Sequence, residues 1–514
     1  MNPPLPLFLP SRKPPLQGQS GTPFTAPTTG LDRRSFLKLA GSALAGVALP
    51  GCTEPARESS KYNHTRKPNF VIIFCDDLGY GDLGCFGSQK HRTPNIDNMA
   101  AEGTRLTSFY VTSGVCTPSR ASLMTGCYPR RVNLHRTKRG EWVLFPTAPD
   151  GLNPNEITIA EVLKQAGYAT ACIGKWHLGD QPQFLPTRQG FDYYFGIPYS
   201  NDMGERKDRG WPPLPLLRNE TVIEAPVDQN TITRRYTSEA VNFITQNKDR
   251  PFFLYLPHTM PHDPHHSSEK FRGKSANGPY GDAVEEIDFS TGQILNTLNK
   301  LRIDDRTLVI FTSDNGAAKN YPGSNAPLSG HKGSTWEGGM RVPCVARWPG
   351  KIPPRKTCDE LASTIDLLPT FAKLAATTAP TDRIIDGRDI WPLLSGGPGA
   401  KSPHEAFYYY YTDQLHAVRS GPWKLHLPLS PKIGGWRGKP DHTPPFLYDV
   451  RVDQDPGEIK DLAKQHPDIV KRLTALAQKA AKDLGDLDRQ GHGQRPSGLV
   501  TAPKPLLLNA QNGG

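Results

Sequence analysis

Four apolar runs of strand length, each followed at once by polar or charged residues, constrain the fold of this chain more than any other feature. They lie at residues 70–75, 169–173, 252–256 and 308–312. Continuous apolar runs of this length are typical of strands buried on both faces of a parallel sheet. Amphipathic patterns of helical period separate them, at 156–166, 236–245 and 283–301. The alternation predicts an α/β fold with a mostly parallel sheet flanked by helices.

The pattern changes after a predicted helix at 363–374. Short aromatic and β-branched segments follow at 407–411, 417–419 and 423–427, and an amphipathic helix is predicted at 469–484. We therefore expect a catalytic domain at 67–400 and a smaller C-terminal α+β domain with an antiparallel sheet at 401–486. Residues 487–514 are rich in Gly, Pro, Gln and Asn, and are predicted to form a disordered tail.

The N-terminal residues carry a targeting pattern. Residues 32–38 read DRRSFLK, and a mildly apolar stretch follows at 39–49. This arrangement is typical of a twin-arginine export signal, so residues 1–51 are predicted to be a leader and 52–66 a linker. Leu49-Pro50-Gly51-Cys52 is similar to a lipoprotein cleavage box, although Pro50 is unusual there. The mature protein is expected in the periplasm or on the cell surface, with lipidation of Cys52 left open.

Composition excludes several classes of protein. The 514 residues are 36% hydrophobic and 22% charged, and no apolar run approaches the length of about 20 residues that a membrane-spanning helix needs. The eight cysteines do not form the paired spacing of a zinc site. The formal net charge of +11 would favour a polyanion such as a sulfated glycan, but a generic basic surface explains it equally well. No nucleic-acid motif is present.

Polar side chains follow each predicted strand. Asp76 and Asp77 follow the first run, Lys175 and His177 the second, His258 and His262 the third, and Asp314 and Asn315 the fourth. Ligands of a parallel α/β sheet bind beyond the carboxyl ends of its strands, so these side chains are expected at one edge. Asp76, Asp77, Asp314 and Asn315 form an oxygen-only set suited to Ca²⁺ or Mg²⁺. Taken alone, the pair Asp76-Asp77 is also compatible with a simple turn.

Cys116 begins a second distinctive segment, at 116–126 (CTPSRASLMTG). Pro118 suits the first turn of a helix, which would place Cys116 at the helix N-terminus, where negative charge is favoured. Arg120 lies about one turn further along. The chemistry alone allows an activated thiolate, and a buried structural cysteine is the plain alternative.

The segment Cys-x-Pro-Ser-Arg followed by Thr-Gly resembles the signature of the sulfatase family, in which the cysteine is oxidised to formylglycine. Further segments are similar to the family's other motifs, at 76–84 (DDLGYGDLG), 174–179 (GKWHLG), 311–316 (FTSDNG) and 331–339 (HKGSTWEGG). The resemblance covers roughly residues 67–480. Residues 189–191 (QGF) and 196–200 (GIPYS) make the arylsulfatase A type the nearest likeness. The resemblance implies an alkaline-phosphatase-like sheet and hydrolysis of aryl or carbohydrate sulfates.

The resemblance also implies a role for each matching residue. Formylglycine at position 116, once hydrated, would be the nucleophile, made by a formylglycine-generating enzyme. Asp76, Asp77, Asp314, Asn315 and the group at 116 would hold Ca²⁺, with Mg²⁺ as the alternative, and Asp314 would help to activate the attacking hydroxyl. Arg120 and Lys175 would orient the nucleophile, and Lys175 would also touch the sulfate. His262 and Lys332 would bind sulfate and assist the departing oxygen, one of them as general acid. His177 would deprotonate the remaining hydroxyl to release sulfate, and Ser200 would add a hydrogen bond to the substrate.

Several of these residues have other interpretations. Lys175 and His177 are compatible with a turn after a strand, and Lys332 with a solvated loop lysine. The cluster His258, His262, His265 and His266 suggests zinc, but its proline-interrupted spacing is not that of a helical ligand pair. Arg130 and Arg131 are expected to be surface charges.

Three other functions are compatible with the same residues. They are a phosphonate or phosphate diester hydrolase of the same fold, a non-catalytic glycan-binding lipoprotein, and a hydrolase that uses free Cys116. Substrate specificity is expected in the loops at 201–228 and 428–445, with Trp436 and Arg437 as a hypothetical sugar-stacking surface. The twin-arginine export machinery is an expected partner.

Overall fold

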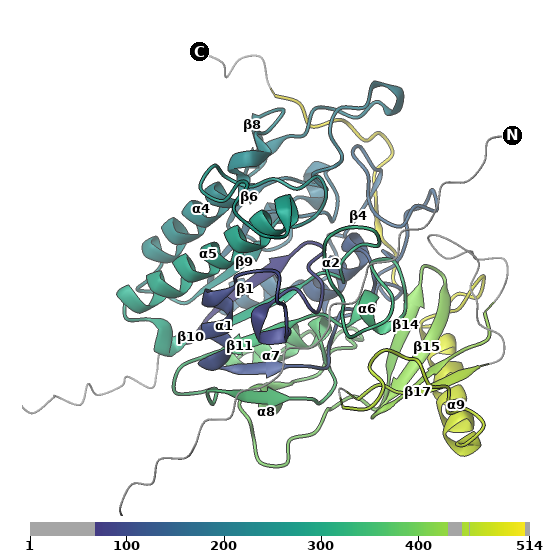
Figure 1. The fold of residues 1–514 in the computed structure, drawn as a ribbon. Coiled ribbons are helices and arrows are strands. Elements are labelled where there is room, and N and C mark those ends of the chain that lie inside the picture. Colours follow the sequence, from purple (N-terminus) through teal and green to yellow (C-terminus); the bar gives the residue numbers. More distant parts are fainter. Residues whose placement is uncertain (1–66, 430–444, 452, 509–514) are drawn as a thin grey trace, which may run out of the picture. The chain divides into compact units, whose positions relative to one another are not determined.

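The computed structural model describes residues 67–429, 445–451 and 453–508. Its central element is a sheet of ten strands in the described part of the chain, in the order β12-β2-β11-β10-β1-β9-β5-β6-β7-β8 (Figure 1). The strands are β1 (Asn69–Cys75), β2 (Thr104–Leu106), β5 (Ala169–Ile173), β6 (Tyr193–Gly196), β7 (Leu216–Arg218), β8 (Thr221–Glu224), β9 (Phe252–Pro257), β10 (Thr307–Ser313), β11 (Cys344–Arg347) and β12 (Lys356–Cys358). The four predicted strands are β1, β5, β9 and β10, which lie side by side at its centre.

The middle of this sheet is parallel and its margins are mixed. β10, β1, β9, β5 and β6 are parallel neighbours, whereas β11, β7 and β8 pair antiparallel. The prediction of a mostly parallel sheet is confirmed. Every residue of β1, β5, β9 and β10 is buried, which is why these strands appear in the sequence as continuous apolar runs.

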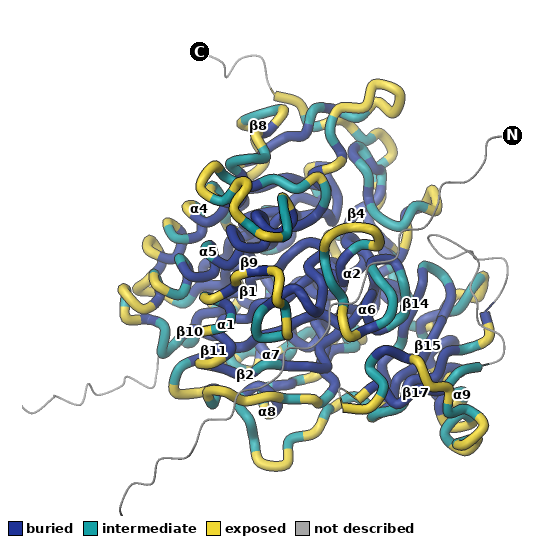
Figure 2. Tube along the Cα trace, in the orientation of Figure 1, coloured by how far each residue is buried: buried dark blue, intermediate teal, exposed yellow. Residues whose placement is uncertain are grey.

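Helices cover both faces of the sheet, and β1 contributes alternate side chains to the two cores. Phe70, Ile72 and Phe74 pack with α2 (Cys116–Thr125), α3 (Ile159–Gln165) and α7 (Leu367–Leu374). Val71, Ile73 and Cys75 pack with α1 (Pro94–Ala101), α4 (Ile232–Gln246) and α5 (Gly278–Lys300). Figure 2 shows the resulting buried centre, with exposed residues in the peripheral loops.

A separate antiparallel sheet follows along the chain, as expected. It consists of β14 (Phe407–Tyr411), β15 (Gln414–Ser420), β16 (Trp423–His426) and β17 (Phe446–Asp449), and α9 (Pro467–Asp483) packs against it. The remaining short elements are β3 (Phe109–Tyr110), β4 (Asp150–Gly151), β13 (Ala362–Ser363), β18 (Gly498–Leu499), α6 (Glu337–Met340) and α8 (Trp391–Leu394). The domain boundary between residues 400 and 401 stays a prediction.

Residues 487–508 differ from the disordered tail expected from their composition. β18 pairs antiparallel with β4. Arg495 donates to both oxygens of Glu156, at 2.7 and 2.9 Å. These contacts join segments more than 300 positions apart, so the local composition of the tail carries no sign of them.

Arg130 and Arg131 are also placed differently from the expectation, because both are buried. Arg131 bridges Asp386 and Asp483 at 2.6 Å each, and Arg130 pairs with Asp413 at 3.1 Å. They are therefore internal ion pairs and not surface charges.

No helix in the described residues is long and apolar enough to cross a membrane. The twin-arginine segment, Cys52, the linker, Trp436 and Arg437 lie outside the described residues.

Candidate active site

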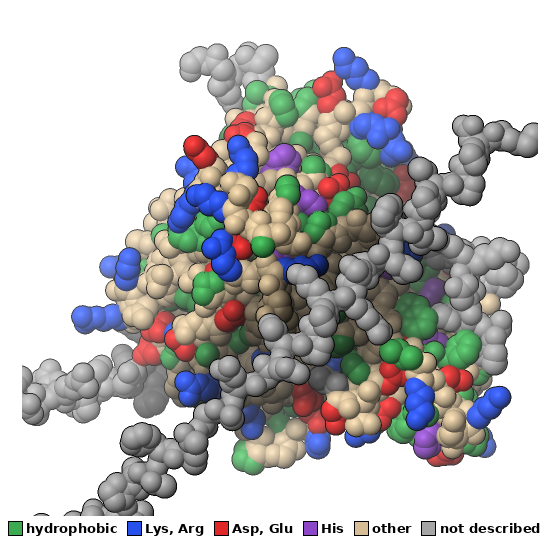
Figure 3. All heavy atoms as spheres, in the orientation of Figure 1, with side chains coloured by type: hydrophobic (Ala, Val, Ile, Leu, Met, Phe, Trp, Pro, Cys, Tyr) green, Lys and Arg blue, Asp and Glu red, His purple; other side chains and the backbone are tan. Residues whose placement is uncertain are grey.

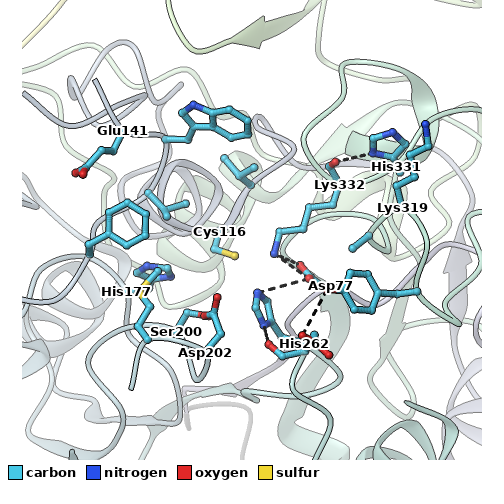
Figure 4. A pocket seen from close by; sticks show the side chains of 18 of the residues that line it. Asp77, Cys116, Glu141, His177, Ser200, Asp202, His262, Lys319, His331 and Lys332 are labelled. Carbon is cyan, nitrogen blue, oxygen red and sulfur yellow. Dashed lines mark hydrogen bonds and ion pairs between the residues drawn. The ribbon is translucent and has the colours of Figure 1, made fainter. Parts of the chain in front are cut away.

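The carboxyl ends of the four central strands open into a pocket of about 590 Å³. Its lining includes the predicted site residues Asp77, Cys116, His177, Ser200, His262 and Lys332 (Figure 4). Asp76, Arg120, Lys175, Asp314 and Asn315 are buried and bond to one another or to these lining residues. The structure therefore brings together the residues predicted for the site, whereas His258, also expected at this edge, lies in the core and outside the pocket lining.

Cys116 is the first residue of α2 and is almost fully buried. Its Sγ donates to Asp76 Oδ1 at 3.4 Å. Burial raises the pKa of the Cys116 thiol well above its usual value, and the negative charge of Asp76 raises it further. A cysteine at a helix N-terminus can form a reactive thiolate. Here burial and the neighbouring Asp76 carboxylate oppose ionisation of the Cys116 thiol.

The Arg120 guanidinium binds the Asp314 carboxylate and lies near that of Asp76. Its Nε and Nη2 donate to Asp314 Oδ2 at 3.1 and 2.8 Å, and its Nη1 donates to the Lys175 carbonyl at 2.8 Å. The side chain is completely buried, so these are charge-assisted bonds in a region of low dielectric. Arg120 thus joins the strand ends of β5 and β10.

Two lysines bind different carboxylates of the site. Lys175 Nζ pairs with Asp76 Oδ2 and donates to Ser200 Oγ at 3.2 Å. Lys332 Nζ lies 2.7 and 2.8 Å from the two oxygens of Asp77. Burial lowers the pKa of Lys332, but Asp77 and other nearby anions more than offset this and raise it above its ordinary value. Lys332 is therefore a buried ammonium, and the solvated-loop interpretation does not fit.

His177 is held in one tautomer. Its Nε2 lies 2.8 Å from the Leu144 carbonyl and must donate, which leaves Nδ1 as the acceptor. Nδ1 is buried and has no hydrogen-bond partner within the described ranges. Burial lowers the pKa of His177 well below its usual value, and Lys175 and Arg120 lower it further. The imidazole is therefore neutral, with a free lone pair available to accept a proton.

Of the four clustered histidines, His262 has the clearest link to the site. Its Nε2 lies 3.7 Å from Asp77 Oδ2 (Figure 4), whereas His258 is sealed in the core beside Tyr236, where burial lowers its pKa to about 3. The group of described side chains that could share a metal consists of Asp76, Asp77, Cys116 and His262. It includes none of the other three histidines, so a histidine-rich zinc site has no support.

The residues around Asp77 fit a hard divalent cation. Asn315 Oδ1 is buried without a hydrogen-bond partner in the described part of the chain, while Asn315 Nδ2 donates to Asp77 Oδ1 at 2.7 Å. Burial raises the pKa of Asp314 to about 7, and the neighbouring Asp76 contributes to the rise. Carboxylates this crowded repel one another, and a cation among them would remove that cost. Asp76 and Asp77 lie within reach of one ion, and Asp314 and Asn315 are hydrogen-bonded to Asp77. Such an oxygen-rich donor set is one that Ca²⁺ and Mg²⁺ accept.

Other residues of the pocket were not identified from the sequence. They are Val115, Gly140, Glu141, Trp142, Val143, Phe145, Asp202, Met203, Asp263, Ala318, Lys319, Tyr321 and His331. Asp202 and Met203 fall in a loop expected to govern specificity, and His331 falls in one of the motifs. The others carry no local signal, because only folding brings their loops to the strand ends.

The family follows from a comparison of the whole chain. Residues 68–377, more than half of the sequence, match the family described as Sulfatase. The chain belongs to the sulfatase family. Residues 402–497 of this sulfatase match the C-terminal region of aryl-sulfatase, and residues 331–427 match the C-terminal region of N-sulphoglucosamine sulphohydrolase.

Individual relatives agree with this assignment. Arylsulfatase A of Homo sapiens is 40% identical over 452 residues, which cover 80% of this chain and 87% of that protein. N-acetylgalactosamine-6-sulfatase of Canis lupus familiaris is 38% identical over 479 residues, covering 86% and 88%. The crystal structure of PsFucS1 sulfatase from Pseudoalteromonas sp. superposes with a TM-score of 0.71 at 29% identity, covering 80% of this chain and 90% of that one. This sulfatase is a sulfuric ester hydrolase, and the predictions of family, fold class and enzyme class are confirmed.

Proposed function

We propose that this sulfatase hydrolyses aryl or carbohydrate sulfate esters, to an alcohol and inorganic sulfate, with a hydrated formylglycine made from Cys116. The supporting observation is the position of Cys116, which begins α2 at the wall of a pocket between Asp77, His262 and Lys332. Its protonated thiol is a poor nucleophile, which speaks against a hydrolase that uses free Cys116. Conversion by a formylglycine-generating enzyme is a two-electron oxidation of Cβ in which an external oxidant takes the two electrons, water supplies the aldehyde oxygen and the sulfur leaves as hydrogen sulfide.

Asp76, Asp77, Asp314 and Asn315 would hold Ca²⁺, or Mg²⁺, together with the group at position 116. When bound, the cation supplies positive charge that stabilises the transferring sulfuryl group and the attacking oxygen. The sequence predicted this set, and the orphaned Asn315 Oδ1 supports it.

The chain's own side chains would carry out the remaining steps. Lys332 and Lys175 bring two buried ammonium groups to the sulfate oxygens, with Ser200 as a further hydrogen-bond partner. His262 lies at the open side of Asp77 and is placed to give a proton to the departing oxygen, with Lys332 beside it. Arg120 keeps Asp314 in position, and Asp314 helps to activate the attacking hydroxyl.

His177 would complete the cycle. Its free Nδ1 takes the proton from the hydroxyl that remains on residue 116 after sulfuryl transfer. This proton removal expels sulfate and restores the aldehyde, without attack of water on sulfur. The neutral tautomer found here is the one that this step requires.

The decisive experiment is the mass of the peptide that contains Cys116, from protein purified out of its native host, together with assays on 4-nitrophenyl sulfate, phosphate and phosphonate esters. We expect the aldehyde mass and the highest kcat/KM on the sulfate. An unmodified cysteine, or a phosphonate ester hydrolysed far faster than the sulfate, would reject the proposal.

We further propose that the protein is exported through the twin-arginine pathway to the periplasm or cell surface. The support is the sequence pattern at Arg33 and Arg34, with Cys52 as a candidate lipid site. Replacing both arginines by lysine should leave the protein in the cytoplasm on fractionation, and replacing Cys52 by Ala should show whether lipid anchors it.

A further inference from the structure

The inner and outer parts of the active-site pocket carry different charged side chains. The inner part, around Cys116, presents Lys332 paired with Asp77, and the adjacent His262. The outer part carries the carboxylates of Glu141, Asp202 and Asp263, with Lys319 as the one ammonium among its lining residues. In Figure 4, Glu141 and Asp202 lie on the other side of Cys116 from Lys319 and His331. The inner end therefore offers an ammonium and an imidazole beside one paired carboxylate, whereas carboxylates outnumber the single ammonium further out.

One wall of the outer pocket is apolar and aromatic. Trp142, Val143, Phe145 and Met203 line it. Trp142 meets Tyr411 of β14 edge-on, with ring centroids 5.6 Å apart, and Phe145 stacks on Trp211 at 5.2 Å. Trp142 and Phe145 are partly exposed, so both packed rings still offer surface to a ligand.

The dimensions suit one ring beyond the sulfate. A volume of about 590 Å³ lies in the usual range of about 300–1,000 Å³ for small-molecule sites. Carboxylates accept hydrogen bonds from hydroxyl groups and repel a second anion. The aromatic wall suits the flat face of a pyranose or an aryl ring.

We propose that the pocket selects sulfate esters whose leaving group is an uncharged ring, a neutral sugar or a phenol, and that Glu141 and Asp202 discriminate against leaving groups with a second anion. This inference rests on the proposed function and narrows its substrate class. The formal net charge of +11 would by itself favour polyanionic substrates at long range, which is the opposite of the proposed selectivity. Figure 3 shows acidic and basic side chains intermingled on the face in view, so the net positive charge is not gathered there into one basic patch.

The test compares two esters of one shape, 4-carbamoylphenyl sulfate and 4-carboxyphenyl sulfate, on enzyme whose formylglycine has been verified by mass. The wild type should favour the uncharged amide in kcat/KM by about tenfold or more at low salt, and 0.5 M NaCl should shrink this preference because salt screens exposed charges. The double variant Glu141→Gln/Asp202→Asn should lower the preference at least about threefold, mainly by improving the carboxylate ester. Intrinsic reactivity differences cancel when the preference is compared between proteins.

Two further variants separate the possible causes. Asp249→Asn removes an exposed carboxylate outside the pocket and should leave the preference unchanged. Trp142→Ala should reduce kcat/KM for both esters alike, by about three- to tenfold, and so leave their ratio intact.

Equal use of both esters by the wild type, or a preference that neither salt nor the double variant alters, would overturn the inference while leaving the proposed function standing. Failure of the modified enzyme to hydrolyse either ester would reject the proposed function itself.

Discussion

At the scale of single residues, Asp77 and His177 hold backbone conformations that most residues avoid. Their φ angles are 64° and 62°, in the left-handed region. Asp77 lies two residues beyond the end of β1 and His177 four residues beyond the end of β5, and both side chains line the pocket. Strain of this kind persists where the surrounding structure over-determines it, and here it occurs at two residues whose side chains line the same pocket.

Replacing His177 by Ala should separate the two halves of the proposed reaction. Without Nδ1 to take the proton from residue 116, sulfate release should slow and kcat should fall by about 10²-fold or more, while the first sulfuryl transfer continues. A burst of 4-nitrophenol and a sulfated peptide in the mass spectrum would reveal the trapped intermediate. The exposed His492→Ala variant is the control. A fall in kcat with no burst and no sulfated peptide would contradict the role given to His177.

Replacing Arg131 by Ala should destabilise the fold with little direct effect on chemistry. Its side chain is 1% exposed and pairs with Asp386, which is 11% exposed, so the variant leaves a nearly buried carboxylate without its partner. The expected loss is about 3 kcal/mol of unfolding free energy. Thermal or urea unfolding measures it, with the exposed Arg139→Ala as the matched control. Equal stability of the two variants would show that this ion pair contributes little.

At the scale of elements, the C-terminal sheet holds the loop that carries Lys332. Lys424 of β16 pairs with Glu337 at 3.0 Å and with Glu458 at 2.8 Å, and donates to the Thr335 carbonyl at 2.8 Å. Thr335 Oγ1 also bonds to His416 of β15 at 3.1 Å. These contacts are buried, so the small sheet is a support for one wall of the active site and not only an appendage.

Lys424→Met should therefore reduce both stability and activity. It leaves the carboxylates of Glu337 and Glu458 buried with less neutralising charge, at an expected cost of about 3–5 kcal/mol. It also frees the Thr335 carbonyl, so KM for aryl sulfates should rise as the Lys332 loop loses its anchor. The double variant Lys424→Met/Glu458→Gln should recover stability, because it removes one of the unpaired charges. A double variant no more stable than the single one would contradict this account.

At the scale of the whole molecule, buried ionisable groups make stability depend on pH in both directions. Burial raises the pKa of Glu337, but Lys424, Arg341 and Arg419 lower it to about 2. Its contribution is therefore present above the unfolded carboxyl pKa of about 4.5 and is lost as the pH falls towards 2. His404 behaves oppositely, because Asp366, at 2.7 Å, raises its pKa more than burial lowers it.

The stability that His404 contributes should decrease as the pH rises. A histidine whose pKa is raised in the folded state stabilises fully below its unfolded pKa of about 6.5, and this stabilisation disappears as the pH rises through the folded value. His404→Gln should thus lower the melting temperature more at pH 5.5 than at pH 9. Melting curves of the wild type, this variant and the exposed His492→Gln control test it. A larger loss at pH 9 would show the opposite sign of coupling.

The sequence by itself determined the central sheet and the set of residues at its edge. Runs such as 70–75 and 308–312 are apolar throughout because both faces of their strands are buried, and strands of that kind end at a common edge. Asp76, Asp77, Asp314 and Asn315 could therefore be grouped from chain position alone. The motif around Cys116 also indicated the sulfatase family, and the match of residues 68–377 to that family confirms it.

Only the tertiary structure decided the electrostatic state of these groups and the shape of the pocket. The position of Cys116 at a helix start favours a thiolate, yet burial beside Asp76 keeps the thiol protonated. The sequence predicts Arg131 to be a surface charge and residues 487–514 a disordered tail, yet ion pairs hold Arg131, and β18 holds part of the tail, against segments remote in the chain. The reason is physical: strand burial is written into local periodicity, whereas charge state and ligand selectivity depend on distances between side chains that only folding brings together.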